Sequence, residues 1–197
     1  GRLASKKSIR KMQTVQIKRL NGHYGPYGYG YGLGITSDFL GHEKLSHGGS
    51  IIVTTAYMAI VPDIKAGVVM MGNASGMSYS RIADSALALL MGKNPDDVIP
   101  ALQIRKRMKQ LAGDYAIYRG LDRMKVIIKG GMLYMEYRSP LNPENVTLTP
   151  LIPEDPSLAS TTFYVLSNGL KYPVEFMTSE NGGIDFIYGR SLYHRVD

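Results

Sequence analysis

The feature that most constrains the fold is a series of short β-rich runs that extends from residue 114 to the end of the chain. Each run is four to six residues long and rich in β-branched and aromatic side chains. The runs are residues 115–118, 124–128, 133–137, 146–151, 162–166, 172–177, 184–188 and 192–196. Eight short strands at regular spacing predict an antiparallel meander that closes into a small barrel or a sandwich.

Turn chemistry separates several of these runs. Gly-rich or Asn-Gly segments lie at residues 129–131, 167–169, 180–183 and 188–190, and a Pro-rich segment spans residues 140–156. The side chains of Tyr115, Tyr134, Tyr164 and Tyr188 could line a ligand cavity. Barrels of this strand number usually fill their interior with side chains, so we expect a packed core instead.

The first half of the chain mixes helix and strand signals. Residues 5–12 can form a short helix capped by Ser5 or Ser8. Glycine and tyrosine alternate in the segment at residues 21–35, which predicts a loop that enters a strand and presents Tyr27, Tyr29, Tyr31 and Leu33 on one face. The β-branched run at residues 50–61 predicts one strand, which a turn at residues 62–67 connects to a partner strand at residues 68–71.

Two helices follow and mark a division into domains. The first begins at Ser78 or Ser80 and is ended by Gly92, and the second covers residues 100–111. We therefore expect one domain at residues 1–91, a linker and helix at residues 92–112, and an all-β barrel domain at residues 113–197. The fold class is α+β, with antiparallel strands and a helix followed by an antiparallel barrel.

The net charge of +7 is concentrated near the start of the chain. Residues 1–37 hold seven basic side chains and no acidic one, whereas the other 16 basic side chains are balanced by 16 acidic ones. Nucleic-acid binding would favour basic residues on one face with interleaved aromatics, and the nearby tyrosines belong to a separate Gly-rich segment. We expect no nucleic-acid partner. No apolar run approaches the roughly 18 residues of a membrane-spanning helix, so no membrane span is expected either.

The titratable residues argue against a metal site. The chain has no Cys and only four His, at positions 23, 42, 47 and 194, and no pair of them has helical ligand spacing. The glycines at residues 28–34 miss the spacing of a dinucleotide-binding loop by one position. We expect no metal and no cofactor.

One segment stands out as a candidate for chemistry. It reads Leu45-Ser46-His47-Gly48-Gly49-Ser50, continues to a Pro-Asp turn at residues 62–63, and returns through Gly67-Val68-Val69 to Asn73. Tyr29-Gly30-Tyr31-Gly32-Leu33-Gly34 precedes it. The ordered pieces over about residues 5–91 resemble the C-terminal part of penicillin-recognising serine hydrolases, the class C β-lactamase-like family, in its H-x-G form. The β-rich region resembles the lipocalin-like barrel appended to some archaeal peptidase-like members.

The resemblance implies roles for four residues. His47 takes the place of the Lys in the commoner K-T-G motif and positions substrate, while Gly48 and Gly49 let substrate approach an edge strand. The N–H of Ser50 then serves as one of two oxyanion donors. The alternative interpretation of His47 is a hydrogen-bonding residue at the start of a strand beside a Gly-Gly turn.

Two motifs of that family are missing from this sequence. Ser8-Ile9-Arg10-Lys11 has the letters of the S-x-x-K nucleophile motif but stands only about 40 residues before His47. No Y-x-N occurs, and Ser179-Glu180-Asn181 follows His47 instead of preceding it. Because a covalent acyl-enzyme requires a nucleophile and a base, we expect this chain alone to be inert.

We therefore expect a part of a serine hydrolase that cleaves amide or ester bonds through an acyl-enzyme. Its partners would be the N-terminal catalytic half that carries S-x-x-K and Y-x-N, a peptide or ester substrate and, as an option, further copies of itself. The start at Gly1-Arg2-Leu3-Ala4 lacks Met and any targeting pattern, which suggests a piece of a longer protein and leaves the cytoplasm as the default location. The alternative is a non-catalytic β-barrel module that binds a ligand or a partner protein.

Overall fold

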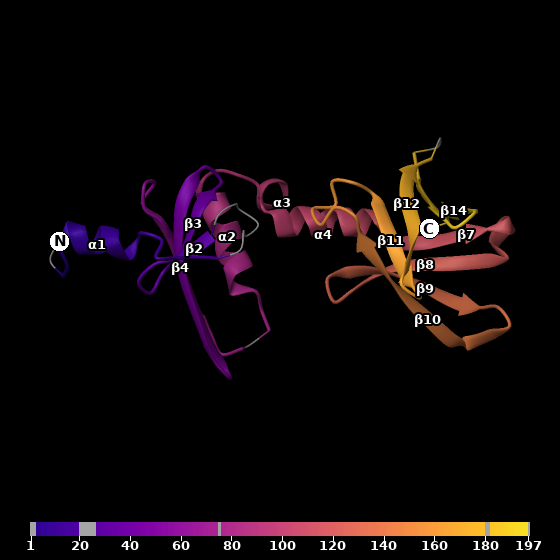
Figure 1. Ribbon diagram of the computed structural model, residues 1–197, viewed down its shortest axis with the longest axis horizontal. Coiled ribbons are helices and arrows are strands. Elements are labelled where there is room, and N and C mark those ends of the chain that lie inside the picture. Colours follow the sequence, from indigo (N-terminus) through magenta and orange to yellow (C-terminus); the bar gives the residue numbers. More distant parts are fainter. Residues whose placement is uncertain (1–2, 20–26, 75, 180–181, 197) are drawn as a thin grey trace. The chain divides into compact units, whose positions relative to one another are not determined.

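The computed structural model describes residues 3–19, 27–74, 76–179 and 182–196. The chain divides into two compact units, Gly1–Leu102 and Gln103–Asp197. Figure 1 traces their helices and strands along the sequence. Among the described residues, no helix is long and apolar enough to cross a membrane.

The first unit is built on an antiparallel sheet of six strands in the order β1-β2-β3-β4-β5-β6. Its strands are β1 (Ile17–Lys18), β2 (Tyr27–Tyr29), β3 (Gly34–Phe39), β4 (His42–Ile51), β5 (Thr54–Val61) and β6 (Ala66–Gly72). The helices of this half are α1 (Lys6–Met12), α2 (Tyr79–Leu90) and α3 (Pro95–Val98), and α4 (Pro100–Leu111) follows across the boundary between the units.

Helix α2 packs on the sheet through an apolar stripe. Ala83, Leu87 and Ala88 are fully buried against Phe39 and neighbouring strand residues. A polar contact joins the same two layers, because the ammonium of Lys44 on β4 lies 2.5 Å from the carboxylate of Asp84 on α2. The Lys44 Nζ also lies 4.4 Å from the centre of the Phe39 ring. Helix α2 is therefore held to β4 by both apolar packing and a buried ion pair.

The structure corrects two expectations for this sheet. The run at residues 50–61 is not one strand, because β4 ends at Ile51, a two-residue turn follows, and β5 starts at Thr54. Ile52 in that turn adopts a φ of 48°, a conformation that β-branched residues rarely take. The Gly-Tyr segment is also interrupted, since a turn around Gly32 (φ 78°) separates β2 from β3. The part of that expectation that falls on residues 21–26 lies outside the described residues.

The second unit is a closed eight-stranded antiparallel barrel, so the open choice between barrel and sandwich resolves to the barrel. Its strands follow the order β10-β11-β12-β13-β14-β7-β8-β9 around the wall. They are β7 (Gly113–Ile117), β8 (Asp122–Lys129), β9 (Met132–Ser139), β10 (Asn142–Pro153), β11 (Thr162–Ser167), β12 (Leu170–Thr178), β13 (Ile184–Tyr188) and β14 (Ser191–Arg195), with a short 3-10 turn at Tyr118–Gly120. Residues 180–181 of the expected turn at 180–183 lie outside the described residues.

Aromatic side chains fill the barrel interior. Phe186 contacts Tyr115 edge-on at 4.9 Å between ring centres, stacks on Tyr193 at 4.8 Å and lies 5.2 Å from Phe176. Burial and the neighbouring carboxylate of Asp122, which accepts a hydrogen bond from the Tyr193 hydroxyl at 3.2 Å, raise the pKa of Tyr193 to about 12. The interior is thus a packed core of the kind expected from the strand number.

Helix α4 closes one end of the barrel. Met108 and Leu111 belong to the barrel core. The last carbonyls of the helix accept hydrogen bonds from the barrel: Tyr115 Oη donates to the Leu111 carbonyl at 2.8 Å, and the Arg195 guanidinium donates to the carbonyls of Gln110 and Ala112. These donors satisfy carbonyls that a helix end leaves without intrahelical partners.

Candidate functional site

The candidate site is the part of β4 that extends beyond its neighbour β3. The ladder between β3 and β4 ends at the pair Gly34↔Ser46. The ladder with β5 continues from Leu45 to Ile51, so the stretch from His47 to Ile51 is paired with β5 on one side. Its other side has no strand partner among the described residues, and we call this stretch, residues 47–51, the free edge of β4.

The direction of the backbone groups on this edge follows from the two hairpins that flank β4. Their two-residue loops are closed by the pairs Phe39↔His42 and Ile51↔Thr54. Such loops close on hydrogen-bonded pairs, and hydrogen-bonded and non-bonded pairs alternate along an antiparallel ladder. Counting from either hairpin gives the same result: odd-numbered residues of β4 bond to β5 and even-numbered ones face β3. The N–H groups of Gly48 and Ser50 therefore point outward from the free edge.

His47 lies at the start of the free edge with an exposed side chain. Its Nδ1 is 3.3 Å from the hydroxyl of Tyr29 on β2. An imidazole nitrogen donates or accepts a hydrogen bond according to the tautomer of the ring. The contact with the Tyr29 hydroxyl therefore orients the His47 ring in either tautomer. The structure thus brings His47 together with one tyrosine of the Gly-Tyr segment.

The two glycines differ in what surrounds them. A Cβ at Gly48 would lie 2.8 Å from Cδ2 of Tyr57, so the tyrosine ring occupies the space that a side chain would need. A Cβ at Gly49 would meet nothing within 4 Å. Gly48 therefore has a packing reason to be glycine, whereas Gly49 leaves open space above the strand.

Tyr57 links the free edge to the interior of the unit. Burial raises the pKa of its hydroxyl, an effect that the charge of Asp84 adds to and that a hydrogen bond with Ser46 partly offsets. Beside it, the hydroxyl of Ser50 lies 2.9 Å from that of Thr55. The hydroxyl of Ser50 is thus engaged across the β4–β5 pair, while its N–H faces outward.

The S-x-x-K look-alike lies apart from this strand. Ser8 belongs to the first turn of α1, where its N–H donates to Ser5 Oγ at 3.0 Å and its hydroxyl lies 2.9 Å from the same atom. No residue of α1 is buried. Ser8 therefore takes part in helix capping. Of the Ser179-Glu180-Asn181 look-alike, the last two residues lie outside the described residues.

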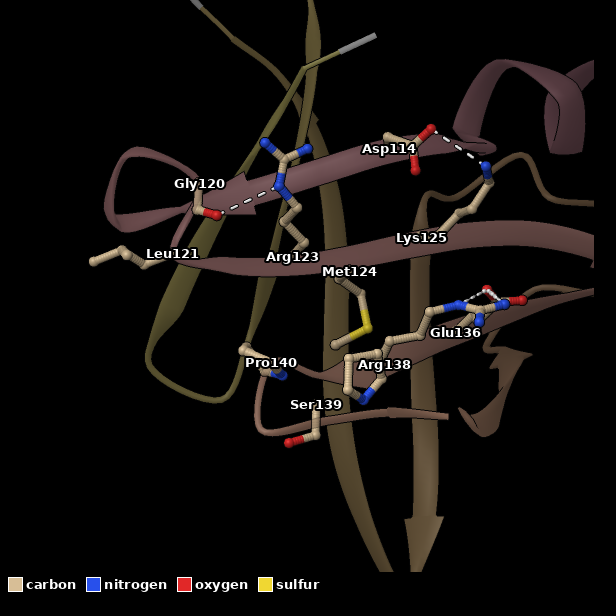
Figure 2. Close-up of a pocket in the computed structure, with 11 residues that line it drawn as sticks. Asp114, Gly120, Leu121, Arg123, Met124, Lys125, Glu136, Arg138, Ser139 and Pro140 are labelled. Atoms are coloured by element: carbon tan, nitrogen blue, oxygen red, sulfur yellow. Dashed lines mark hydrogen bonds and ion pairs between the residues drawn. The ribbon is translucent and has the colours of Figure 1, made fainter. Parts of the chain in front are cut away.

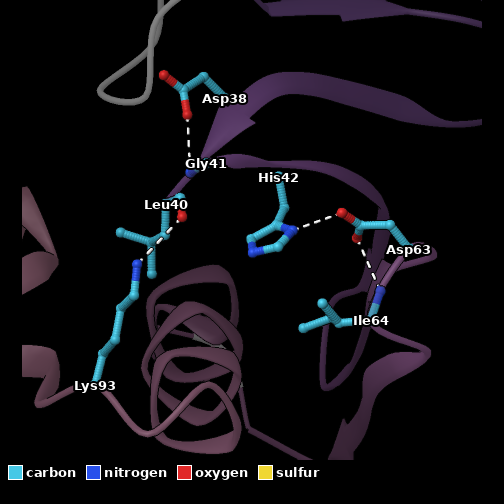
Figure 3. Close-up of polar contacts among 7 residues, drawn as sticks. All are labelled: Asp38, Leu40, Gly41, His42, Asp63, Ile64 and Lys93. Atoms are coloured by element: carbon cyan, nitrogen blue, oxygen red, sulfur yellow. Dashed lines mark hydrogen bonds and ion pairs between the residues drawn. The ribbon is translucent and has the colours of Figure 1, made fainter.

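A second histidine is held by a carboxylate on the same sheet, a contact that the sequence does not signal. Figure 3 shows His42 Nδ1 directed at Asp63 Oδ2, at 2.6 Å. The hydrogen bond from His42 lowers the pKa of Asp63. His42 also lines an open pocket of about 590 Å³ with Ile64, Lys65 and Lys93. The pair joins the β3–β4 hairpin to the β5–β6 turn, and we assign it a structural role.

Over the part of the chain that the structure describes, no three His, Asp or Glu side chains gather in a way that could hold a metal ion. His194 instead contacts Asp185 at 2.9 Å on the barrel, and His23 lies outside the described residues. The exposed free edge is therefore the arrangement on which we base the function.

A family match and a solved structure define the class of protein. Residues 95–194 match the Pab87 octamerisation domain, and the chain belongs to this family. A structure described as the octameric penicillin-binding protein homologue from Pyrococcus abyssi is 35% identical, with a TM-score of 0.83 over 98% of this chain and 42% of that chain. Both matches support membership of a penicillin-binding-protein-like family.

Two further structures are far less similar. They are crystal structures of SurE, one of them with D-Leu, each 18% identical over 98% of this chain and 44% or 42% of theirs, with TM-scores of 0.32 and 0.31. Scores this low do not indicate a shared fold. No curated protein matched the chain. The chain spans about two fifths of the length of the Pyrococcus protein.

Proposed function

We propose that this chain is the C-terminal part of a penicillin-binding-protein-like serine hydrolase. Its first unit supplies the H-x-G wall of an acyl-transfer site, and its second unit holds several copies of the protein together. The observation that carries the catalytic half of the proposal is the free edge of β4, which starts at His47 and presents outward-pointing N–H groups.

The chemistry of the wall follows from these groups. An acyl group attacked by a serine develops negative charge on its carbonyl oxygen, and a preorganised N–H at that point stabilises the transition state. The N–H of Ser50 is directed to this role, because Ser50 and Thr55 form a non-hydrogen-bonded pair of the β4–β5 ladder and the N–H faces away from β5. Open space above Gly49 admits the substrate, and His47, oriented by Tyr29, offers it a hydrogen bond.

The nucleophile and its base belong to a segment outside this sequence. In the proposed enzyme they stand on an N-terminal catalytic half that carries S-x-x-K and Y-x-N, and the substrate is a peptide or an ester. Exposed apolar side chains at residues 51–53, 69 and 71 support this division, since they offer a surface for such a half to cover.

Two substitutions at one position test the oxyanion role in the full-length gene product. Ser50→Pro removes the N–H, and proline is tolerated on an edge where the N–H does not bond to the neighbouring strand. Ser50→Ala removes only the hydroxyl and is the matched control. Losing one oxyanion donor lowers kcat by about 10²–10³-fold, so Ser50→Pro should slow phosphonylation of the nucleophilic serine by a serine-reactive phosphonate to that extent, while Ser50→Ala stays within a few-fold of wild type.

The outcome separates the catalytic reading from a merely structural one. Thermal unfolding of both variants confirms that the sheet is intact. Equal phosphonylation rates for Ser50→Pro and wild type, with the sheet folded, would remove Ser50 from the oxyanion site. Labelling of Ser8 instead of a serine elsewhere in the gene product would place the nucleophile on α1 and overturn the proposal.

The family match favours a second candidate function, a non-catalytic assembly module. The matched region covers the whole barrel, from β7 to nearly the end of β14, and its description names octamerisation. Under this candidate the barrel assembles copies whether or not the first unit takes part in catalysis. A full-length product that forms large assemblies but never reacts with the phosphonate would support the module alone.

A further inference from the structure

The two ends of the barrel are built differently. Successive strands of a meander run in opposite directions, so the loops after β7, β9, β11 and β13 lie at one end. Helix α4 leads into β7 at the other end, where Met108 and Leu111 close the core. The chain thus covers one end of the barrel with its own helix and leaves the other end to its hairpin loops.

The hairpin loops at the uncovered end carry large apolar side chains. After β7, Tyr118 and Leu121 are 69% and 78% exposed, and after β9, Leu141 is 96% exposed. Leu166 and Leu170 flank the loop after β11 and are also exposed. Together these five residues form what we call the tip surface. Apolar residues gathered at three successive loops mark an interaction surface, because solvated loops are ordinarily polar.

A hollow lined by residues of β7, β8 and β9 reaches the first two of these loops. Figure 2 shows Gly120 and Leu121 on one side and Ser139 and Pro140 on the other, and the hollow has a volume of about 520 Å³. Its acidic side chains are engaged with basic ones: Asp114 lies 3.4 Å from Lys125, and Glu136 lies 3.0 Å from Arg138. The hollow thus holds two ion pairs and the further charge of Arg123 beside the apolar loop residues.

The pairing of the strands bears on how copies can associate. Each strand of the closed barrel has a neighbour on both sides, but β10 pairs with β11 only at Ile152 and Pro153, so residues 142–151 of β10 have no strand partner on that side among the described residues. Contacts between barrels can therefore use loops, outward-facing side chains or this part of β10. The tip surface offers the loops, and the family description supplies the occupant, further copies of the same chain.

We propose that the tip surface, with the hollow beside it, is the contact between copies of this protein. The inference rests on the proposed assembly function of the barrel and adds to it the surface through which the copies associate. Leu121, which lines the hollow, and Leu141, which follows the lining residue Pro140, are the two most exposed residues of this surface.

The test compares the two ends of the barrel in the intact chain. Leu121→Asp and Leu141→Asp, alone and together, place charge on the tip surface, and Val196→Asp places charge at the α4 end on a side chain that is 53% exposed. Native mass spectrometry and light scattering over a concentration series give the assembly state. The double tip variant should raise the midpoint concentration of assembly at least tenfold, and Val196→Asp should leave it unchanged.

A second measurement does not depend on disrupting the assembly. Because the chain has no Cys, single variants Leu141→Cys and Val196→Cys each carry one thiol for maleimide labelling. In the assembled protein, the thiol at 141 should react at least tenfold more slowly than in dilute protein, while the thiol at 196 reacts equally in both.

The results distinguish the failure of the surface from the failure of the function. Wild-type assembly that persists in the double tip variant, or equal labelling of both thiols, would overturn the tip surface and leave the assembly function standing. A wild-type chain that stays monomeric at every concentration would overturn the assembly function and the tip surface with it. Circular dichroism of each variant verifies that the barrel is folded.

Discussion

The ion pair between Lys44 and Asp84 gives the sharpest prediction for the first unit. Lys44 is 4% exposed and Asp84 7% exposed, and their charged atoms are 2.5 Å apart. Replacing Asp84 with Ala leaves an ammonium buried without this counter-charge. Breaking a buried pair by removing one partner costs about 3–5 kcal/mol, so Asp84→Ala should lower the free energy of unfolding of this unit by that amount.

The double variant Lys44→Met, Asp84→Leu should behave differently from either single variant. Apolar side chains of similar size remove both charges from the interior, and replacing a buried ion pair in this way is often neutral or stabilising. The double variant should therefore lie within about 1 kcal/mol of wild type or above it, which gives a coupling energy of several kcal/mol between the two positions.

Hydrogen exchange measured by mass spectrometry is the suitable assay, because it resolves the two units of the chain. Peptides from β4 and α2 report the first unit, and barrel peptides serve as the internal reference. If Asp84→Ala changes the exchange free energy of β4 by less than about 1 kcal/mol, then Lys44 reaches water in the native state and the buried pair does not hold β4 to α2. The same strand carries His47 and Ser50, so a loosened β4 would also expose the candidate site to exchange.

Two further predictions concern Gly48 and Asp63. Gly48→Ala should cost about 1–3 kcal/mol because its Cβ would press on the Tyr57 ring, whereas Gly49→Ala should be neutral or slightly stabilising; equal unfolding free energies would contradict the packing explanation. The lowered pKa of Asp63 stabilises the fold above the ordinary carboxyl pKa of about 3.8, and this contribution is lost as pH falls through the lowered value. The stability difference between wild type and Asp63→Asn should therefore be present at pH 5 and shrink on acidification, and a difference that stays constant to pH 2.5 would argue against the His42 contact.

The barrel could be predicted from the sequence because its signals are local. Residue pairs such as Gly130-Gly131 and Asn168-Gly169 lie in hairpin loops with positive φ, and each of the eight predicted runs overlaps a strand, although β10 extends well beyond the predicted residues 146–151. Closure into a barrel depends on the pairing of β14 with β7, which joins His194 to Ala116. No local pattern encodes a contact across that separation, so the choice between barrel and sandwich stayed open.

The hairpin between β4 and β5 was missed for the opposite reason. Ile52 and Val53 are β-branched and uncharged, and they carry none of the turn residues that relieve a positive φ. A continuous β-branched run is therefore equally compatible with one long strand. The turn position is set by pairing with strands on both sides, which the sequence of the turn itself does not report.

Only part of the candidate site could be predicted from the sequence, for a related reason. The Gly-Gly dipeptide after His47 stands out in the sequence, but the free edge exists because β3 begins at Gly34 and goes no further along β4. The contacts of Lys44 with Asp84 and of His42 with Asp63 join residues 40 and 21 positions apart. Spacing rules recognise pairs three or four residues apart and do not detect such contacts.

The two units differ in the surfaces that they offer for contact, and this difference supports separate roles for them. The barrel is closed and carries exposed apolar side chains at its loop tips. The first unit leaves residues 47–51 unpaired on one side, and this stretch contains no Pro and no charged side chain of the kind that usually blunts an exposed edge. An exposed edge of this composition can pair with strands of other molecules and so promotes aggregation unless something covers it. The peptide substrate and the N-terminal catalytic half that we propose would both cover it, which is why the free edge argues for a site and the barrel tips argue for an assembly contact.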